Sequence, residues 1–293
     1  MNYRVRHRTT YHYEDPVSVS HHVVRLTPRN LSRQICRGSH VSIQPVPSAS
    51  SARFDYFGNS LTFFTLQEPH DALIVEASSD LEVKATESLD FSASPRWETV
   101  RDSSINPHNA LANEILNACQ FVFDSQRVRS SPELAAYARE SFPSGRPLLE
   151  AVLDLTRRIH LDFRFDKKAT EVATPVQTFF EKRRGVCQDF AHLQVGCMRS
   201  LGLPARYVSG YLRTMPPPGR PRLVGADASH AWCSAWCPGT GWVDFDPTNN
   251  CVPSDGHITV AWGRDYSDVS PIYGVLLGGA KHTLDVEVDV TPE

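Results

Sequence analysis

The middle of the chain carries the run Arg184-Gly185-Val186-Cys187-Gln188-Asp189-Phe190-Ala191-His192-Leu193. Gly185 ends a helix that starts near Thr174, and apolar residues recur at helical spacing after it. The pattern predicts a new helix that begins at Cys187 and runs to about Leu201. The first N–H groups of a helix have no intrahelical partner, and the macrodipole adds positive charge there, so a cysteine at this place is favoured as the nucleophilic thiolate. Taken alone, a buried structural cysteine is the more common role for such a residue.

A second segment, from Ala228 to Cys237, alternates like a strand and places His230 and Trp232 on one face. Pro238-Gly239-Thr240-Gly241 predicts a turn, after which Trp242–Asp246 returns as the partner strand of a hairpin. A simple hairpin centred on this turn pairs Cys233 with Asp246. It leaves His230 about three residues, or ~10 Å, out of register, so a bulge or an asymmetric loop is expected to bring His230 to Asp246.

The acidic partner of the histidine has two candidates, because Asp244 and Asp246 lie on the same face of the predicted strand. Asp246 has the better claim, since Pro247 holds the preceding residue in extended geometry at the strand end. Local geometry alone therefore leaves both aspartates as candidates for the partner of His230.

Together these segments resemble the core of bacterial transglutaminase-like proteins. The resemblance rests on 184–193, on Arg199–Leu212, on His230-Ala231-Trp232 and on Gly241–Thr248, in that order along the chain. The start of the chain, with Tyr11-His12-Tyr13 and Ser20-His21-His22, resembles the β-rich N-terminal region that accompanies this core, as does Asp55–Asn59.

The resemblance implies an α+β fold with a papain-like, transglutaminase-like core and a Cys-His-Asp triad. Carried over by position, Cys187 is the nucleophile, His230 the general base and acid, and Asp246 the group that orients the histidine. The backbone N–H of Cys187 is the expected oxyanion donor. No cofactor is expected.

The expected function is hydrolysis of a peptide or protein amide through a thioester acyl-enzyme. The same triad supports two alternatives in which an amine or another acceptor takes the acyl group, namely a transglutaminase or another acyltransferase. A third alternative, of a different class, is a catalytically idle peptide-binding module that keeps the fold.

Patterning outside these motifs predicts the domain organisation. Residues 1–90 read as short alternating strands with turns, which favours a β-sandwich-like N-terminal domain. Residues 91–145 are expected to be a connecting segment with helices, one of which Ser131 caps. Residues 146–293 are expected to form the catalytic core, including an alternating C-terminal strand from Leu284 to Val290. The proline-rich stretch Pro216–Pro221 can only be a loop.

Composition excludes several classes of protein. A formal net charge of −3 gives no global attraction to nucleic acid or to an anionic membrane surface. The sequence has no apolar run near ~18 residues and no apolar core of a signal peptide behind its charged start, so we expect neither a transmembrane helix nor secretion. Seven cysteines, an odd number without a framework, favour reduced thiols and a cytoplasmic location.

No metal site is expected either. Cys233 and Cys237 lie four residues apart on a strand and are therefore separated by ~13 Å, too far for two ligands of one zinc ion. His192 lies more than one turn beyond Cys187 and is expected to be structural. Asp189, in the first turn of the same helix, is explained by the helix dipole.

Overall fold

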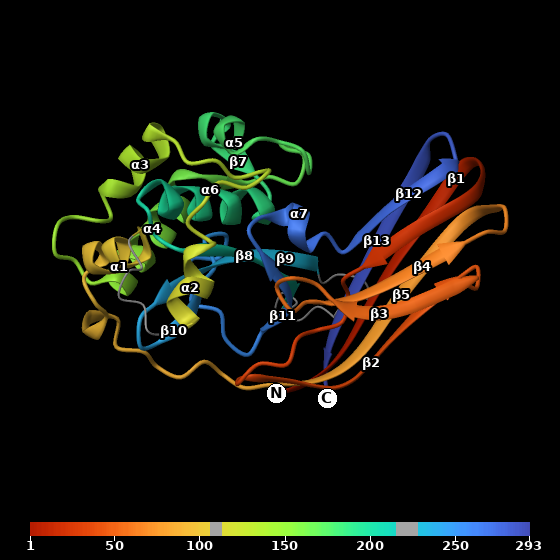
Figure 1. The fold of residues 1–293 in the computed structure, drawn as a ribbon, viewed down its shortest axis with the longest axis horizontal. Helices are drawn as coiled ribbons and strands as arrows, with labels where there is room; N and C mark the ends of the chain where they lie inside the picture. The colour runs from red at the N-terminus through yellow and green to blue at the C-terminus, as the bar shows by residue number, and fades with distance from the viewer. Residues whose placement is uncertain (106–112, 215–227) are drawn as a thin grey trace, which may run out of the picture.

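The computed structural model describes residues 1–105, 113–214 and 228–293 of the protein, and it consists of two parts (Figure 1). One part is a long curled antiparallel sheet, and the other is a smaller sheet covered by helices. The expected α+β class with a β-rich N-terminal region is thereby confirmed. None of the described helices is long and apolar enough to cross a membrane.

The large sheet is built around one strand, β1 (Asn2–Val24), which has neighbours along both of its edges. On one edge β5 and then β4 run antiparallel to it, and on the other edge β13 and then β12 do so. The register of β1 shifts between His12 and Val17 against β5, and between Val17 and Val19 against β12. The other strands of this sheet are β2 (Gln34–Gln44), β3 (Ala49–Phe54), β4 (Ser60–Leu66), β5 (His70–Val83), β12 (Ile272–Gly278) and β13 (His282–Pro292).

The last two strands, β12 and β13, were expected to belong to the catalytic core, but they pair with the N-terminal sheet. β13 pairs with the first half of β1 from Tyr3 opposite Pro292 to Tyr13 opposite His282. Its alternating pattern was sufficient to predict a strand with one buried face, but not which sheet would receive it. The structure places 272–292 in the same sheet as the N-terminal region, so the two ends of the chain lie side by side (Figure 1).

The second part contains the motifs. Its sheet has the order β10-β9-β8-β11 and is antiparallel throughout. These strands are β8 (Ala205–Leu212), β9 (Ala228–Cys237), β10 (Gly241–Phe245) and β11 (His257–Gly263), and a short parallel pair is formed by β6 (Arg164–Phe165) and β7 (Arg184–Gly185). The helices are η1 (Phe91–Ala93), α1 (Trp97–Ile105), α2 (Asn113–Cys119), α3 (Pro132–Arg139), α4 (Leu148–Asp162), α5 (Val176–Lys182), α6 (Cys187–Ser200) and α7 (Tyr266–Val269).

Helix α6 is the centre of this part. It lies against β8 and β9 and is surrounded by α3, α4 and α5, so that nearly every residue from Gln188 to Arg199 is buried. Arg199, at its end, is held by backbone carbonyls of Phe121, Ala205 and Arg264. The expected helix from Cys187 is therefore present, and burial on all sides fixes its position.

The two parts share a core of apolar side chains. Tyr3, Val5 and Val290 of the large sheet pack against Tyr207 and Ile258 of the small one. Burying each such side chain stabilises the folded state by roughly 1.5–3 kcal/mol.

Further along the same face the two sheets separate. Leu284 and Val286 of β13 are 54% and 46% exposed, whereas Val288 and Val290 are fully buried. The seam between the two parts thus opens into a cavity at the level of Thr9 and Leu284.

Gly185 occupies the tightest place beside the start of α6. A Cβ atom there would collide with the Asp189 carboxylate and would come within 2.7 Å of the Phe179 ring. We expect Gly185→Ala to destabilise the protein by about 1–3 kcal/mol, because overpacking forces buried neighbours to move. Thermal unfolding should show a fall in Tm for this variant. Gly38→Ala is the control, since nothing lies within 4 Å of its added methyl group, and equal Tm values for the two variants would contradict the prediction.

Candidate active site

Cys187 is the first residue of α6, as the sequence predicts. The turn before the helix is fixed by Asp189, whose carboxylate accepts hydrogen bonds from the Val186 N–H at 2.8 Å and from the Thr170 hydroxyl at 2.6 Å. Asp189 thus caps the helix by direct contact, in addition to the dipole effect expected from the sequence. Burial raises the pKa of this carboxyl, while both hydrogen bonds act in the opposite direction. Cys187 itself is only half-buried, which leaves its sulfur accessible.

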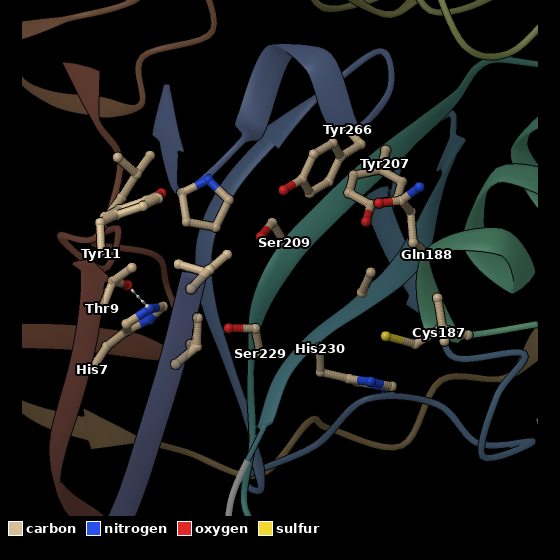
Figure 2. Close-up of a pocket in the computed structure, with 16 residues that line it drawn as sticks. His7, Thr9, Tyr11, Cys187, Gln188, Tyr207, Ser209, Ser229, His230 and Tyr266 are labelled. Carbon is tan, nitrogen blue, oxygen red and sulfur yellow. Dashed lines mark hydrogen bonds between the residues drawn. The ribbon is translucent and has the colours of Figure 1, made fainter. Parts of the chain in front are cut away.

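His230 lies on β9 and reaches Asp246, which directly follows β10. The imidazole Nε2 is 2.7 Å from Asp246 Oδ2, and both side chains are buried. The Cys187 side chain is a further neighbour of His230 and acts to raise the pKa of the imidazole. Because Asp246 occupies Nε2, the nitrogen left for the thiol is Nδ1. Figure 2 shows the sulfur of Cys187 beside this ring.

The hairpin achieves this contact without the expected bulge. Phe245 pairs with Cys233, one residue away from the predicted register, and the pairing is regular back to Gly241 opposite Cys237. Continuing this register puts Asp246 opposite Trp232. His230, two residues before Trp232, is then the diagonal neighbour of Asp246 on the same face. Diagonal neighbours lie ~7–8 Å apart, a span that an imidazole bridges. The expected bulge is absent: the loop between the paired Cys237 and Gly241 shifts the register by one residue, and the length of the histidine side chain spans the remaining distance.

The structure also separates the two aspartates. The Asp244 carboxylate lies 3.7 Å from the guanidinium of Arg33, in the N-terminal region. Of the two aspartates, only Asp246 contacts His230. Asp246 is also the one that the sequence favoured, because Pro247 follows it.

Asp246 is fully buried, and five donors surround its carboxylate. Oδ1 accepts from the backbone N–H groups of Thr248 and Asn249, at 2.9 and 3.1 Å. Oδ2 accepts from the Asn249 side chain at 2.7 Å, and lies 3.1 Å from Nε2 of a second histidine, His257, besides the contact with His230. This carboxylate is held in a single orientation from all sides.

His257 is the residue of the candidate site that sequence reasoning missed. It is the first residue of β11, two strands away from His230, with β8 between them. Gly210 lies on β8 opposite His230, and a Cβ there would come within 2.6 Å of the Trp232 ring. Trp232 therefore lies over the glycine, and its ring meets His257 edge-on at 5.4 Å between centroids. No local motif marks His257, because its partner comes from another part of the chain.

The electrostatics of the pair favour a charged imidazole. Burial lowers the pKa of His230, but its hydrogen bonds with Asp246 and Cys187 outweigh this effect and raise the pKa to about 10. Burial likewise raises the pKa of Asp246, yet the hydrogen bonds from His230 and His257 hold it well below its usual range.

This charge makes stability depend on pH. The folded-state pKa of His230, about 10, lies above the unfolded value of about 6.5, so its contribution is complete below pH ~6.5 and is lost as pH rises through about 10. We expect wild type to exceed His230→Gln in Tm at pH 6, and the gap to narrow steadily towards pH 10. Thermal unfolding of both proteins from pH 6 to pH 10 measures this difference in Tm. A difference that stays constant over the range would contradict the prediction.

The other histidine and cysteine side chains of the motifs have structural positions. His192 is buried against Tyr207, accepts the N–H of Tyr266 at 3.1 Å, and has a pKa lowered by burial to about 3. Cys233 and Cys237 are buried on β9. The proline-rich loop Pro216–Pro221 lies outside the described residues.

A cluster that could hold a metal ion coincides with the candidate triad. Ligand atoms of His230, Asp246 and His257 all lie within 4.8 Å of one another. Their geometry is accounted for by direct hydrogen bonds, which a metal ion would have to replace. The expectation of no metal therefore stays a prediction.

A cavity of about 320 Å³ opens beside the Cys187 sulfur (Figure 2). The small sheet and the start of α6 contribute Gln188, Ser209 and Ser229, and the large sheet contributes Thr9 and Tyr11. The site thus lies at the junction of the two parts, with the nucleophile candidate on one wall and β1 on the opposite wall.

Comparisons with known proteins agree with this architecture. Residues 3–82 match the bacterial transglutaminase-like N-terminal region, and residues 135–247 match the transglutaminase-like superfamily. An uncharacterised protein of Mycobacterium tuberculosis is 39% identical over 99% of this chain and 92% of its own length. A protein-glutamine gamma-glutamyltransferase of Pseudomonas aeruginosa is 29% identical over 53% of this chain, which corresponds to 22% of that protein.

A solved structure has the same fold. It is that of a candidate cysteine protease from Cytophaga hutchinsonii, which superimposes with a TM-score of 0.74 over 100% of this chain and 91% of the other, at 20% identity. The N-terminal sheet and the helical core occur there together, as they do here. The chain therefore belongs to the transglutaminase-like superfamily, and it carries the bacterial N-terminal region of that family in front of the core.

Proposed function

We propose that the protein is a cysteine-dependent hydrolase of amide or peptide bonds, with Cys187 as nucleophile, His230 as general base and acid, and Asp246 as the orienting group. The observation that carries the proposal is the position of His230, whose imidazole contacts the Asp246 carboxylate at 2.7 Å and lies beside the Cys187 sulfur at the same cavity (Figure 2). The thiol also lies at the N-terminus of α6 and faces a cavity. A nucleophile, a base and an orienting acid in this order form a complete acyl-transfer site.

The reaction divides into two steps. The Cys187 thiolate attacks the carbonyl carbon, the imidazolium of His230 gives its proton to the departing amine, and the C–N bond breaks to leave a thioester. Water then attacks the thioester while His230 takes its proton, and the carboxylic acid leaves with the thiolate restored. The backbone N–H of Cys187, in the unpaired first turn of α6, is positioned to stabilise the oxyanion in both steps.

Alkylation by iodoacetamide near neutral pH tests the nucleophile. We expect Cys187 to react at least tenfold faster than Cys36 and Cys251, which are also half-buried, because neither of these lies next to an imidazolium. Burial raises the pKa of Cys251 to about 11, which further slows it at neutral pH. His230→Gln should remove the advantage of Cys187. Peptide mass spectrometry measures all three rates, and a Cys187 no faster than Cys251 refutes the proposal.

Acyl transfer to an amine is the second candidate, and the similarity to a protein-glutamine gamma-glutamyltransferase favours it. Both reactions share the thioester, so they are distinguished by what receives the acyl group. A peptide digest incubated in ¹⁸O-labelled water with methylamine would reveal the partition by mass spectrometry. We expect mainly ¹⁸O incorporation, and products consisting mainly of methylamides would assign the enzyme to transfer.

We also propose that the protein works in a reducing, cytoplasmic compartment. All seven cysteines are unpaired in the structure, and the proposed nucleophile requires a free thiol. Alkylation of freshly lysed cells, with and without prior reduction, should label the same number of cysteines. A smaller number before reduction would contradict this location.

A further inference from the structure

The cavity beside Cys187 has a wall that the catalytic core does not supply. We propose that this cavity binds the side chain on the acyl side of the scissile bond, and that the large sheet selects an uncharged, medium-sized side chain there. The inference rests on the proposed function, since it assigns a substrate class to the same site. It gives the N-terminal sheet a direct part in specificity.

The sheet wall is apolar and partly exposed. Leu284 and Val286 of β13 line the cavity together with Tyr11 of β1 and Ile272 of β12. They continue the sheet face that is buried against the core at Val288 and Val290, but here the core is absent and aliphatic carbon faces the cavity. A side chain that enters the cavity covers this surface, which is favourable for apolar groups.

The opposite wall is polar without being ionised. Figure 2 shows the hydroxyl groups of Ser209, Ser229 and Tyr266 around the cavity. Apart from the proposed Cys187–His230 ion pair, no charged side chain lines it among the residues that the structure describes. His7 also lines it, and burial lowers the pKa of this imidazole to about 4, so it is neutral at physiological pH. A carboxylate or an ammonium group would lose its water here, and the only counter-charges among the described lining residues belong to the Cys187–His230 pair, which already neutralise each other.

Size and direction define the occupant further. A volume of about 320 Å³ is at the lower end of the range for ligand sites, which suits one side chain with its backbone and not a long segment. The imidazole of His230 points away from Thr9 and Tyr11 (Figure 2). Because the departing amine receives its proton from this ring, it leaves on that side. The acyl group stays bonded to the sulfur, and its side chain is the part that reaches the sheet wall.

Alkylation by N-acetyl amino-acid chloromethyl ketones tests the proposal, because these reagents place one acyl-side side chain beside Cys187. We expect the leucine reagent to alkylate Cys187 at least tenfold faster than the aspartate and lysine reagents. Val286→Asp places a carboxylate on the sheet wall, and should slow the leucine reagent and accelerate the lysine reagent at least tenfold. Leu284→Asp should do the same and serves as a second variant. Leu277→Asp, an exposed position on β12 outside the cavity, is the control and should behave like wild type.

The outcomes distinguish this proposal from the proposed function. Equal rates for all three reagents, or no change in Val286→Asp and Leu284→Asp, would overturn the assignment of the cavity even if iodoacetamide labels Cys187 rapidly. The cavity assignment would also be overturned if the rate of amide cleavage depended on the amine part of the substrate and not on its acyl-side side chain. If Cys187 is no faster than Cys36 towards iodoacetamide, the proposed function itself falls and the cavity assignment with it.

Discussion

Replacing Cys187 with alanine is expected to abolish amide cleavage, with a fall in kcat of roughly 10⁴-fold or more. Every step of the proposed reaction forms or breaks a bond to this sulfur, so no other side chain of the site can substitute for it. The half-buried position at the start of α6 makes the change sterically mild, and the fold should remain intact. Initial rates of the purified variant on a peptide digest, followed by the appearance of new amino groups, measure the loss.

Cys36→Ala is the matched control, because Cys36 is also half-buried but lies on β2, away from the cavity. It should retain wild-type activity within about twofold. Equal activity of Cys187→Ala and Cys36→Ala would exclude the thiol mechanism, whatever the geometry around His230.

Local signals in the sequence were sufficient for the elements that carry the triad. Ser131 and Pro132 predicted the start of α3, where the Ser131 hydroxyl does accept the N–H of Leu134. The predicted helix of 187–201 is observed at Cys187–Ser200. These features depend on neighbours within one or two turns, so a single sequence contains the information.

Contacts between distant parts of the chain were not predictable in the same way. The alternation of 284–290 indicates a strand but not its partner, and β13 pairs with a strand about 280 residues earlier. His257 reaches Asp246 only because Gly210 lets Trp232 lie over the intervening strand. Alternation cannot show either feature, because both are set by tertiary packing. The same limit applies to the cavity, because one wall comes from the middle of the chain and the other from its two ends.

The same packing makes Asp246→Asn the second large expected effect. All five polar groups around the carboxylate are donors, whereas an asparagine has one oxygen and one NH₂ group. If the asparagine oxygen faces the backbone N–H groups of Thr248 and Asn249, its NH₂ group faces the donors that surround Oδ2 in the wild type. If the amide is turned the other way, its NH₂ group faces the two backbone N–H groups. Either way, buried donors lose their acceptor, at a cost of about 1–3 kcal/mol for each unsatisfied group.

Catalysis should suffer along with stability. Without the carboxylate, His230 loses the partner that fixes its tautomer and favours its charged form, and kcat is expected to fall by roughly 10³–10⁴-fold. His257→Leu, which removes one of the donors and keeps the acid, should reduce kcat only about tenfold. The alkylation rate of Cys187 by iodoacetamide should follow the same order, because it depends on the imidazolium and not on substrate binding.

Asp244→Asn is the decisive control for this prediction. It lies two residues earlier on the same hairpin strand, and its carboxylate faces Arg33 at 3.7 Å and not His230. We expect it to retain kcat and the Cys187 alkylation rate within about twofold, since the Asp244 carboxylate pairs with Arg33 and not with His230. If Asp244→Asn is as damaging as Asp246→Asn, the orienting role belongs to the strand as a whole and not to the Asp246 carboxylate. A selective loss in Asp246→Asn would instead tie the reactivity of Cys187 to that carboxylate through His230.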